Sequence, residues 1–392
     1  MVKPVSLEGA TLLQVIPDLA AGGAERTVIE VCEAVVSAGG RAIVASAGGR
    51  LETELTETGA VLVRNESLPS KNPVTIRRNV GWLKALIQRE HVDLIHARSR
   101  APAWSAYWAA KSTRTPFVTT YHGAYNAKSS FKRWYNSVMA RGDIVIANST
   151  YIAAHIAQTY PDATARIVTI PRGVDLEAIH PDNISSNRTE MLQQQWFGDA
   201  CPDRPLILLP GRLTAWKGQQ DAISAMAIRR DRGADVLGTL VLAGDDQGRS
   251  GYLEALKAQI TSLKLDESVS IVGHCSDMGA AYKLCDIVLA PSREPEAFGR
   301  VAAEAGAMGR PVIAAAHGGQ LEIVDDKLTG RLVAPGQPGE IADMIDDILK
   351  LDASQLSALS QAARERIASR FSKASLQAAT LNVYARLLER GH

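Results

Sequence analysis

Short apolar runs alternate with amphipathic segments of helical length along most of this 392-residue chain. Runs such as Leu12–Ile16 and Phe117–Thr120 are rich in aliphatic and β-branched residues, which is typical of buried strands. Segments such as Ala24–Ser37 and Ile76–Arg89 place apolar residues at helical spacing instead. Strands that alternate with helices indicate βαβ units and a parallel sheet covered on both faces. The predicted fold class is therefore α/β.

The alternation stops once and then resumes, which predicts two domains. The stretch 181–203 is polar and lacks either period, so we interpret it as a linker, and strand-like runs restart at Leu206–Leu209. Single cores rarely exceed about 250–300 residues, which also favours two domains. We expect one doubly wound domain over residues 1–185 and a second over 186–375. Ligands of such sheets bind in the crevice at the carboxyl ends of the strands.

Composition excludes several classes of protein. Hydrophobic residues make up 46% and charged residues 22% of the chain, as in ordinary globular proteins, and the net charge of +1 gives no reason to expect nucleic acid. No signal peptide and no run of about 18 apolar residues is present, so we expect a cytoplasmic protein. The cysteines lack zinc spacing and are expected to be buried thiols in a reducing compartment. They are Cys32, Cys201, Cys275 and Cys285.

Positive charge gathers in one part of the first half. Between Arg64 and Arg141 there are 14 Lys and Arg residues against three acidic ones. Aromatic and basic residues also interleave at Trp104–Trp108 and at Phe131–Tyr135. A solvated basic face with aromatic residues in the core explains this pattern. Peripheral contact with an anionic inner membrane, or with an anionic or lipid-linked acceptor, explains it equally well.

Two glycine-containing loops follow predicted strands. Gly22 and Gly23 lie between the first strand and a helix, where the backbone can approach a phosphate, although two glycines also make a plain turn. In the second half, Arg212 and Lys217 lie five residues apart in a loop that ends at Gly218. A guanidinium and an ammonium at the end of a buried strand favour the binding of a diphosphate over a simple capped turn.

An acidic loop opens a helix after the run Ile287–Ala290. Glu296 falls in the loop and Glu304 two turns into the helix. Glu296 can accept hydrogen bonds from sugar hydroxyls, and Glu304 can hold a ribose diol. The backbone N–H groups at the helix start can hold phosphate, whereas a negatively charged first turn would stabilise any helix. The residues that provide these N–H groups are Phe298, Gly299, Arg300 and Val301.

His122 ends a strand of the first domain beside Gly123, which places it at the expected crevice. It can hydrogen-bond a sugar hydroxyl or act on the acceptor, although a single histidine is more often structural. Arg172, after the last strand of that domain, either contacts ligand or fixes a loop. Pairs of aspartates such as Asp245-Asp246 do not converge with another acidic loop, so we expect no essential metal.

In this order, these motifs resemble glycosyltransferase family 4, the retaining enzymes of the GT-B fold. The resemblance covers nearly the whole chain. Within the family, the sequence is most similar to bacterial enzymes of lipopolysaccharide core and exopolysaccharide synthesis. It implies two Rossmann-like domains that face a central cleft, with the C-terminal helix at 376–392 packed back on the first, acceptor-side domain. The second domain would bind a nucleotide-diphospho-sugar.

The resemblance also assigns a role to each site residue. Arg212 and Lys217 would neutralise the donor diphosphate, Glu296 would bind the donor sugar and Glu304 the ribose. The Phe298–Val301 backbone would hold phosphate. Gly23, with Gly22, would close over the diphosphate, and His122 would face the sugar at the reaction centre.

One departure limits what the resemblance says of the donor. The chain has Gly244-Asp245-Asp246 where many relatives have Gly-x-Gly, so GDP-sugars, GDP-mannose among them, and UDP-sugars both remain open. The acceptor is expected to be a glycan or a lipid-linked glycan. Two alternatives also stay open: an epimerase of sugar nucleotides with the same fold, and a noncatalytic scaffold docked on a membrane.

Overall fold

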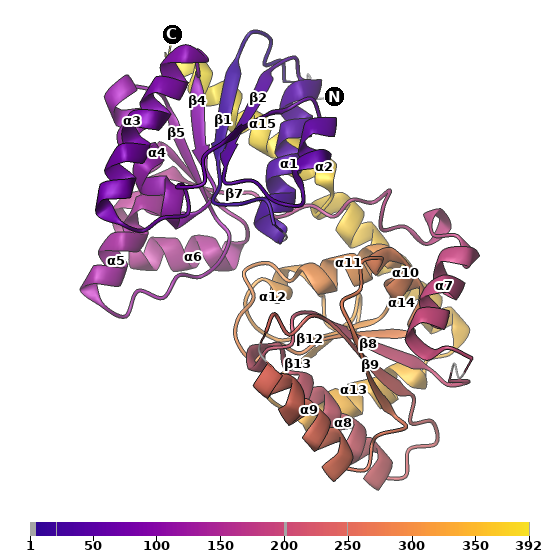
Figure 1. Ribbon diagram of the computed structural model, residues 1–392. Helices are drawn as coiled ribbons and strands as arrows, with labels where there is room; N and C mark the ends of the chain where they lie inside the picture. The colour runs from indigo at the N-terminus through magenta and orange to yellow at the C-terminus, as the bar shows by residue number, and fades with distance from the viewer. Residues whose placement is uncertain (1–4, 21, 200–201, 249, 392) are drawn as a thin grey trace. The chain divides into compact units, whose positions relative to one another are not determined.

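The computed structural model describes residues 5–20, 22–199, 202–248 and 250–391. The chain divides into two compact units, of which the first comprises Met1–Arg172 with Lys373–His392 and the second Gly173–Ser372. Figure 1 shows each unit as a sheet between layers of helices, and the yellow C-terminal helix belongs to the first unit. No helix in the described ranges combines the length and the apolarity needed to cross a membrane.

The first unit contains a seven-stranded sheet in the order β3-β2-β1-β4-β5-β6-β7, and all neighbouring strands are parallel. Its strands are β1 Thr11–Val15, β2 Arg41–Ser46, β3 Val61–Arg64, β4 Leu94–Ala97, β5 Phe117–Tyr121, β6 Ile144–Ala147 and β7 Ile167–Thr169. Its helices are α1 Gly23–Ser37, α2 Glu52–Glu57, α3 Pro73–Arg89, α4 Arg100–Thr113, α5 Ser130–Asn136, α6 Thr150–Thr159 and α15 Lys373–Gly391, with short 3₁₀ helices at Ser137–Ala140 and Pro161–Arg166.

The second unit contains a six-stranded parallel sheet in the order β10-β9-β8-β11-β12-β13. Its strands are β8 Leu206–Pro210, β9 Thr239–Ala243, β10 Val269–Gly273, β11 Ile287–Ala290, β12 Val312–Ala315 and β13 Arg331–Val333. Its helices are α7 Ser186–Phe197, α8 Gln219–Asp231, α9 Ser250–Ser262, α10 Met278–Leu284, α11 Arg300–Met308, α12 Gln320–Ile323, α13 Pro338–Leu349 and α14 Ala353–Arg370, with 3₁₀ helices at Pro181–Asn183 and Ala215–Lys217. Both sheets have the strand order of a Rossmann fold, so the α/β prediction is confirmed.

Local sequence explains where several helices begin. Asn72 caps α3 by accepting from the N–H groups of Val74 and Thr75, and Pro73 follows at a position that needs no donor. Asp352 and Gln355 form a reciprocal capping box at the start of α14. All five residues of β1 are buried, as expected of a central strand covered on both faces.

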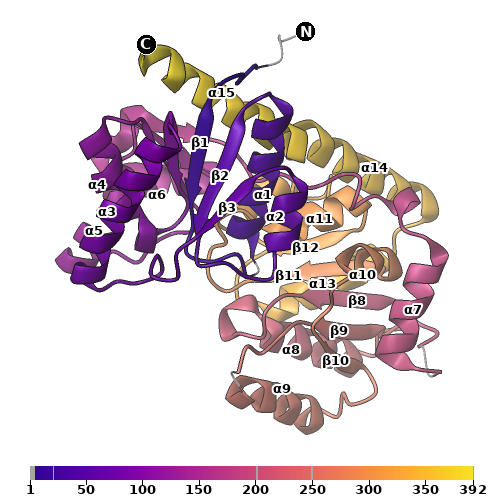
Figure 2. The same ribbon diagram turned by 45° about the horizontal axis from the view of Figure 1, so that its top comes forward.

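Helix α15 completes the core of the first unit. Leu376, Tyr384 and Leu387 are buried in the same cluster as the β1 residue Leu12, and Gln377 donates to the carbonyl of Glu30 in α1. Figures 1 and 2 both show α15 beside α1, on the face of the sheet opposite α3 and α4. The last helix of the chain is therefore part of the first unit.

The boundary between the units differs from the predicted one at 185. It falls after Arg172, because residues from Gly173 onward pack into the second unit. The N–H of Val174 donates to the carbonyl of Phe371, and Val174 and Ile184 lie in the core of that unit. The stretch interpreted as a linker contains α7, whose Leu192 is buried. Only one narrow face of α7 is apolar, so its sequence looked like a polar connection.

Candidate functional site

Two loops that carry predicted site residues lie at the same edge of the second sheet. β8 and β11 are neighbours and parallel, so their carboxyl ends lie at one edge. The chain order reverses between these two strands, which is the topological switch point where open α/β sheets bind ligands. The loop after β8 carries Arg212 and Lys217, and the loop after β11 carries Glu296.

Lys217 and Glu296 form a largely buried ion pair. Lys217 Nζ lies 2.7 Å from Glu296 Oε1, with side-chain exposures of 13% and 11%. Ser292 Oγ donates to the same carboxylate oxygen at 2.5 Å. Burial alone would raise the pKa of Glu296, but Lys217 and the hydrogen bonds outweigh it, and the pKa is lowered. Glu296 is therefore an anion that can accept hydrogen bonds from a ligand.

Backbone contacts hold the two loops together. The N–H of Arg293 donates to the carbonyl of Trp216 at 2.7 Å. Gly218 has φ 79°, and a Cβ there would lie 2.2 Å from the carbonyl oxygen of Pro291, so only glycine fits. The guanidinium of Arg293 also donates to both carboxylate oxygens of Asp221 in α8. These contacts fix Lys217 relative to Glu296 before any ligand arrives.

Arg212 differs from Lys217 because its side chain is exposed. Its carbonyl accepts from Gln219 Nε2 at 2.9 Å. No hydrogen bond or ion pair joins its guanidinium to another residue of the described ranges. The structure thus places Arg212 in the same loop as Lys217, with its five donors available to a ligand.

Helix α11 starts at the end of the acidic loop. Phe298 is buried, Gly299 caps the helix in the left-handed region (φ 98°), and Arg300 and Val301 form its first turn. The first N–H groups of an α-helix have no partner within it and can bind an anion. The structure places these four residues at the start of α11, and their binding of phosphate stays a prediction.

Glu304 is engaged with two protein groups. Tyr282 donates to Glu304 Oε2 at 2.9 Å, and Arg300 donates to Oε1 at 2.6 Å. A ribose diol can bind this carboxylate only by sharing or replacing these contacts. The sequence offered no indication of Tyr282, which comes from α10, or of Ser292 as partners of the two glutamates.

The first unit carries a second cluster of predicted residues. His122 and Arg172 are joined by a contact of 3.1 Å between Nδ1 and a guanidinium nitrogen. A Cβ on Gly23 would lie 2.1 Å from the same guanidinium, so the backbone of Gly23 lies directly against Arg172. Gly22 lies just before α1, and a Cβ there would lie 2.5 Å from Glu25 Oε2, so the side chain of Glu25 packs against this glycine. Arg172 therefore joins two motifs that the sequence treated separately.

A cavity of about 250 Å³ adjoins His122. Arg98, Arg100 and Glu25 also line it. Burial, followed by the nearby Arg172 and Arg98, holds the pKa of His122 well below its usual range, so the ring is neutral. Its Nε2 is buried and has no hydrogen-bond partner in the part of the chain that the structure describes. A neutral imidazole with a free nitrogen can bind a hydroxyl.

Behind this cavity lies a buried polar network. His96 contacts Tyr384 Oη through Nδ1 and Thr120 Oγ1 through Nε2, both at 2.6 Å. Arg98 donates twice to Gln14 Oε1. Sequence reasoning missed this network because Tyr384 is 288 residues from His96. It ties α15 to the strands that carry the cavity residues.

Cysteines and acidic residues provide no metal centre in the described ranges. Cys32, Cys275 and Cys285 are buried and unpaired, and Cys201 lies outside the described residues. No group of three His, Cys, Asp or Glu side chains is placed to hold a metal ion within those ranges. Asp245 follows β9, and its carbonyl accepts from the N–H of Leu213. The expectation that transfer needs no metal stays a prediction.

Comparison with known proteins identifies the family. The model of Glycosyltransferase Family 4 matches residues 21–178, and the model of Glycosyl transferases group 1 matches residues 194–366. A D-inositol 3-phosphate glycosyltransferase of Salinispora arenicola is 30% identical over 328 residues, which are 78% of this chain and 71% of that one. The similarity therefore extends through both units.

Solved structures of other proteins are also similar to this chain over nearly its whole length. A glycosyltransferase from Rickettsia africae is 35% identical with a TM-score of 0.88, over 97% of this chain and 98% of that one. Anabaena HepE, solved in complex with UDP, is 25% identical with a TM-score of 0.81, over 96% and 100% of the two chains. The chain is a transferase with the GT-B fold, and it belongs to glycosyltransferase family 4.

Proposed function

We propose that the chain transfers a hexose from a UDP-sugar to a glycan or lipid-linked glycan of the cell surface, with retention of anomeric configuration. The observation that carries this proposal is the Lys217–Glu296 pair, with the exposed Arg212 in the same loop as Lys217. Arg212 and Lys217 can bind the diphosphate, while the carboxylate of Glu296 accepts hydrogen bonds from sugar hydroxyls. UDP is favoured over GDP because the similar HepE was solved with UDP.

The second unit would act as the donor domain. Arg212, Lys217 and the N–H groups at the start of α11 would stabilise the negative charge that develops on the leaving diphosphate. Such preorganised charge is commonly the largest catalytic contribution. The acceptor oxygen would bond to the anomeric carbon on the face that the diphosphate leaves, and the acceptor proton would pass to the departing phosphate. Glu304 would bind the ribose after exchanging one of its two protein partners.

The first unit would act as the acceptor domain. His122 would hold a sugar hydroxyl through its neutral ring, and the backbone at Gly22 and Gly23 would approach a phosphate. Peripheral attachment to the inner membrane would bring the protein to a lipid-linked acceptor. The many basic residues between Arg64 and Arg141 support that attachment.

A donor panel tests the proposal. The protein is incubated with UDP- and GDP-sugars and a candidate acceptor glycan, and the product's anomeric configuration is read by NMR. We expect one UDP-sugar to yield a retained product and Lys217→Ala to yield almost none. An inverted product would contradict the mechanism. Release of UDP and free sugar without a glycan product would favour the epimerase.

A further inference from the structure

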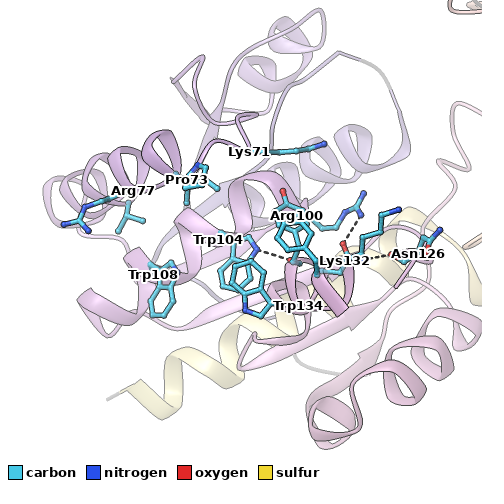
Figure 3. A pocket seen from close by; sticks show the side chains of 14 residues that line it. Lys71, Pro73, Arg77, Arg100, Trp104, Trp108, Asn126, Lys132 and Trp134 are labelled. Atoms are coloured by element: carbon cyan, nitrogen blue, oxygen red, sulfur yellow. Dashed lines mark hydrogen bonds between the residues drawn. The ribbon is translucent and has the colours of Figure 1, made fainter. Parts of the chain in front are cut away.

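The first unit contains a large apolar groove that the proposed chemistry does not use. Its volume is about 1130 Å³, and it lies between α3, α4 and the segment around α5. We call it the aromatic groove, because five aromatic residues line it: Trp104, Trp108, Phe131, Trp134 and Tyr135. Figure 3 shows these tryptophans beside the basic side chains of the same groove.

Most of these rings are exposed to solvent. Phe131 is 71%, Trp134 54% and Trp108 45% exposed. Trp134 stacks on Trp104 with 4.8 Å between ring centres, and Trp104 Nε1 donates to the carbonyl of Tyr135. The hydrogen bond thus holds Trp104 in place, whereas Trp134, the other ring of the stack, is exposed to solvent. Clustered exposed aromatic rings are a feature of binding surfaces.

Four cationic side chains also line the groove. Lys71, Arg77, Arg100 and Lys132 line it, and none of its described lining residues is acidic. In Figure 3, Arg100 and Lys132 lie beside the Trp104–Trp134 stack. An apolar wall with cations along it complements a ligand that has an apolar chain and an anionic group.

Arg100 connects this groove to the His122 cavity. It lines both hollows. Its guanidinium donates to Asn136 Oδ1 at 3.0 Å and lies 4.2 Å from the centre of the Tyr125 ring. An anion held by Arg100 therefore has the aromatic groove on one side and the cavity of His122 on the other.

We propose that the aromatic groove binds the hydrocarbon chain of a lipid-linked acceptor and that Arg100 binds the acceptor's phosphate. The sugar attached to that phosphate then enters the His122 cavity. This inference rests on the proposed transferase function and names its acceptor class. The groove volume of about 1130 Å³ slightly exceeds the range of about 300–1,000 Å³ that is typical of small-molecule pockets, which leaves room for an extended hydrocarbon chain.

Binding of a soluble amphiphile tests the groove without catalysis. The probe is dodecyl phosphate below its micelle concentration, compared with dodecyl maltoside and inorganic phosphate by calorimetry. We expect dodecyl phosphate to bind at least about tenfold more tightly than either comparison compound.

Variants of the groove test which residues bind the amphiphile. The double variant Phe131→Ser with Trp134→Ser should weaken the binding of dodecyl phosphate about tenfold or more by removing apolar contact. Arg100→Gln should remove the preference for the phosphate over the maltoside. Leu328→Ser, at an exposed apolar residue of the second unit, is the matched control and should bind like the wild type.

Three results would overturn the proposal: no binding of dodecyl phosphate, equal binding by the groove variants, or tighter binding of the neutral maltoside. A fourth is binding only to vesicles of phosphatidylglycerol and phosphatidylcholine, lost in the groove variants, which would make the groove a membrane-docking face. UDP binding is measured on the same samples. If the wild type binds UDP but no amphiphile, only the proposal for the groove is rejected. If the wild type does not bind UDP, the proposed transferase site is rejected.

Discussion

Lys217 and Glu296, 79 residues apart in the chain, meet in a hydrogen-bonded ion pair of 2.7 Å at the carboxyl edge of the second sheet. Each belongs to a different loop. The loops are joined by the N–H of Arg293, which donates to the carbonyl of Trp216, and by the close approach of Gly218 to Pro291. The pair therefore presents a cation for phosphate and an anion for hydroxyls from one rigid place.

Lys217→Ala should reduce kcat/KM by about 100-fold or more, because a cation that stabilises the leaving diphosphate contributes on that scale. Glu296→Gln should reduce it as well, since the amide keeps the shape but loses the charge that pairs with Lys217. Steady-state kinetics with the preferred donor measures both. Lys350→Ala, at the exposed lysine that follows the last residue of α13, is the control and should leave the kinetics unchanged. Wild-type kinetics in Lys217→Ala would remove the lysine from the mechanism.

Arg212→Ala should weaken donor binding about tenfold or more and change the free energy of unfolding by less than about 0.5 kcal/mol. The reason is that the Arg212 guanidinium is exposed.

Arg229→Ala should instead reduce the stability of the fold. Arg229 is 1% exposed and pairs with Asp346, so its loss should cost at least about 2 kcal/mol. Denaturant unfolding and donor titration on both variants separate the two roles. A strongly destabilised Arg212→Ala would assign that arginine to the fold instead.

His96 predicts how stability depends on pH. It is buried, and burial followed by Arg98 and His122 holds its pKa well below its usual value of 6.5. In the unfolded chain the ring takes a proton as pH falls below about 6.5, whereas the folded ring stays neutral. Stability is thus full above that pH and falls below it, by up to about 1.4 kcal/mol per pH unit for each such histidine.

Urea unfolding at pH 7.5 and 5.5 measures this dependence. His96→Gln should lose less stability than the wild type between the two values, although it is less stable at both because the contacts to Tyr384 and Thr120 change. His180→Gln, at an exposed position, is the control and should follow the wild type. Equal losses in wild type and His96→Gln would contradict the account.

Removal of divalent metal should leave transfer unchanged. The diphosphate would be neutralised by Arg212, Lys217 and helix N–H groups, so a bridging cation is not required. Initial rates with excess chelator, compared with rates after addition of Mg²⁺ or Mn²⁺, check this expectation. A rate that falls with chelator and returns with Mg²⁺ would require metal ligands that the proposal lacks.

Strands were predictable where burial leaves a plain aliphatic run. The predicted run Ile287–Ala290 has the bounds of β11, and the predicted run Leu12–Ile16 is displaced by one residue from β1, Thr11–Val15. β13 was missed because it has three residues and begins with Arg331, whose charge is balanced by Asp347 of α13. A short strand with a charged residue lacks the apolar signal, and only tertiary pairing makes it a strand.

Site residues were predictable from loop chemistry, but their contacts were not. The sequence indicated Lys217 and Glu296 as separate ligands of phosphate and sugar, whereas their pairing depends on β8 and β11 being neighbours. Tyr384 could not be connected with His96, because the whole second unit separates α15 from the rest of the first unit in the sequence. The proposed role of Arg100 likewise depends on the fold, which makes this side chain line both the aromatic groove and the His122 cavity.

Calorimetric titration with UDP and with uridine tests the central claim most directly, since the two ligands differ in the diphosphate. UDP should bind the wild type at least about tenfold more tightly than uridine, and Arg212→Ala and Lys217→Ala should lose most of that difference while uridine binding is unchanged. Equal affinities for UDP and uridine in the wild type, or an undiminished preference in both variants, would contradict a diphosphate site at Arg212 and Lys217.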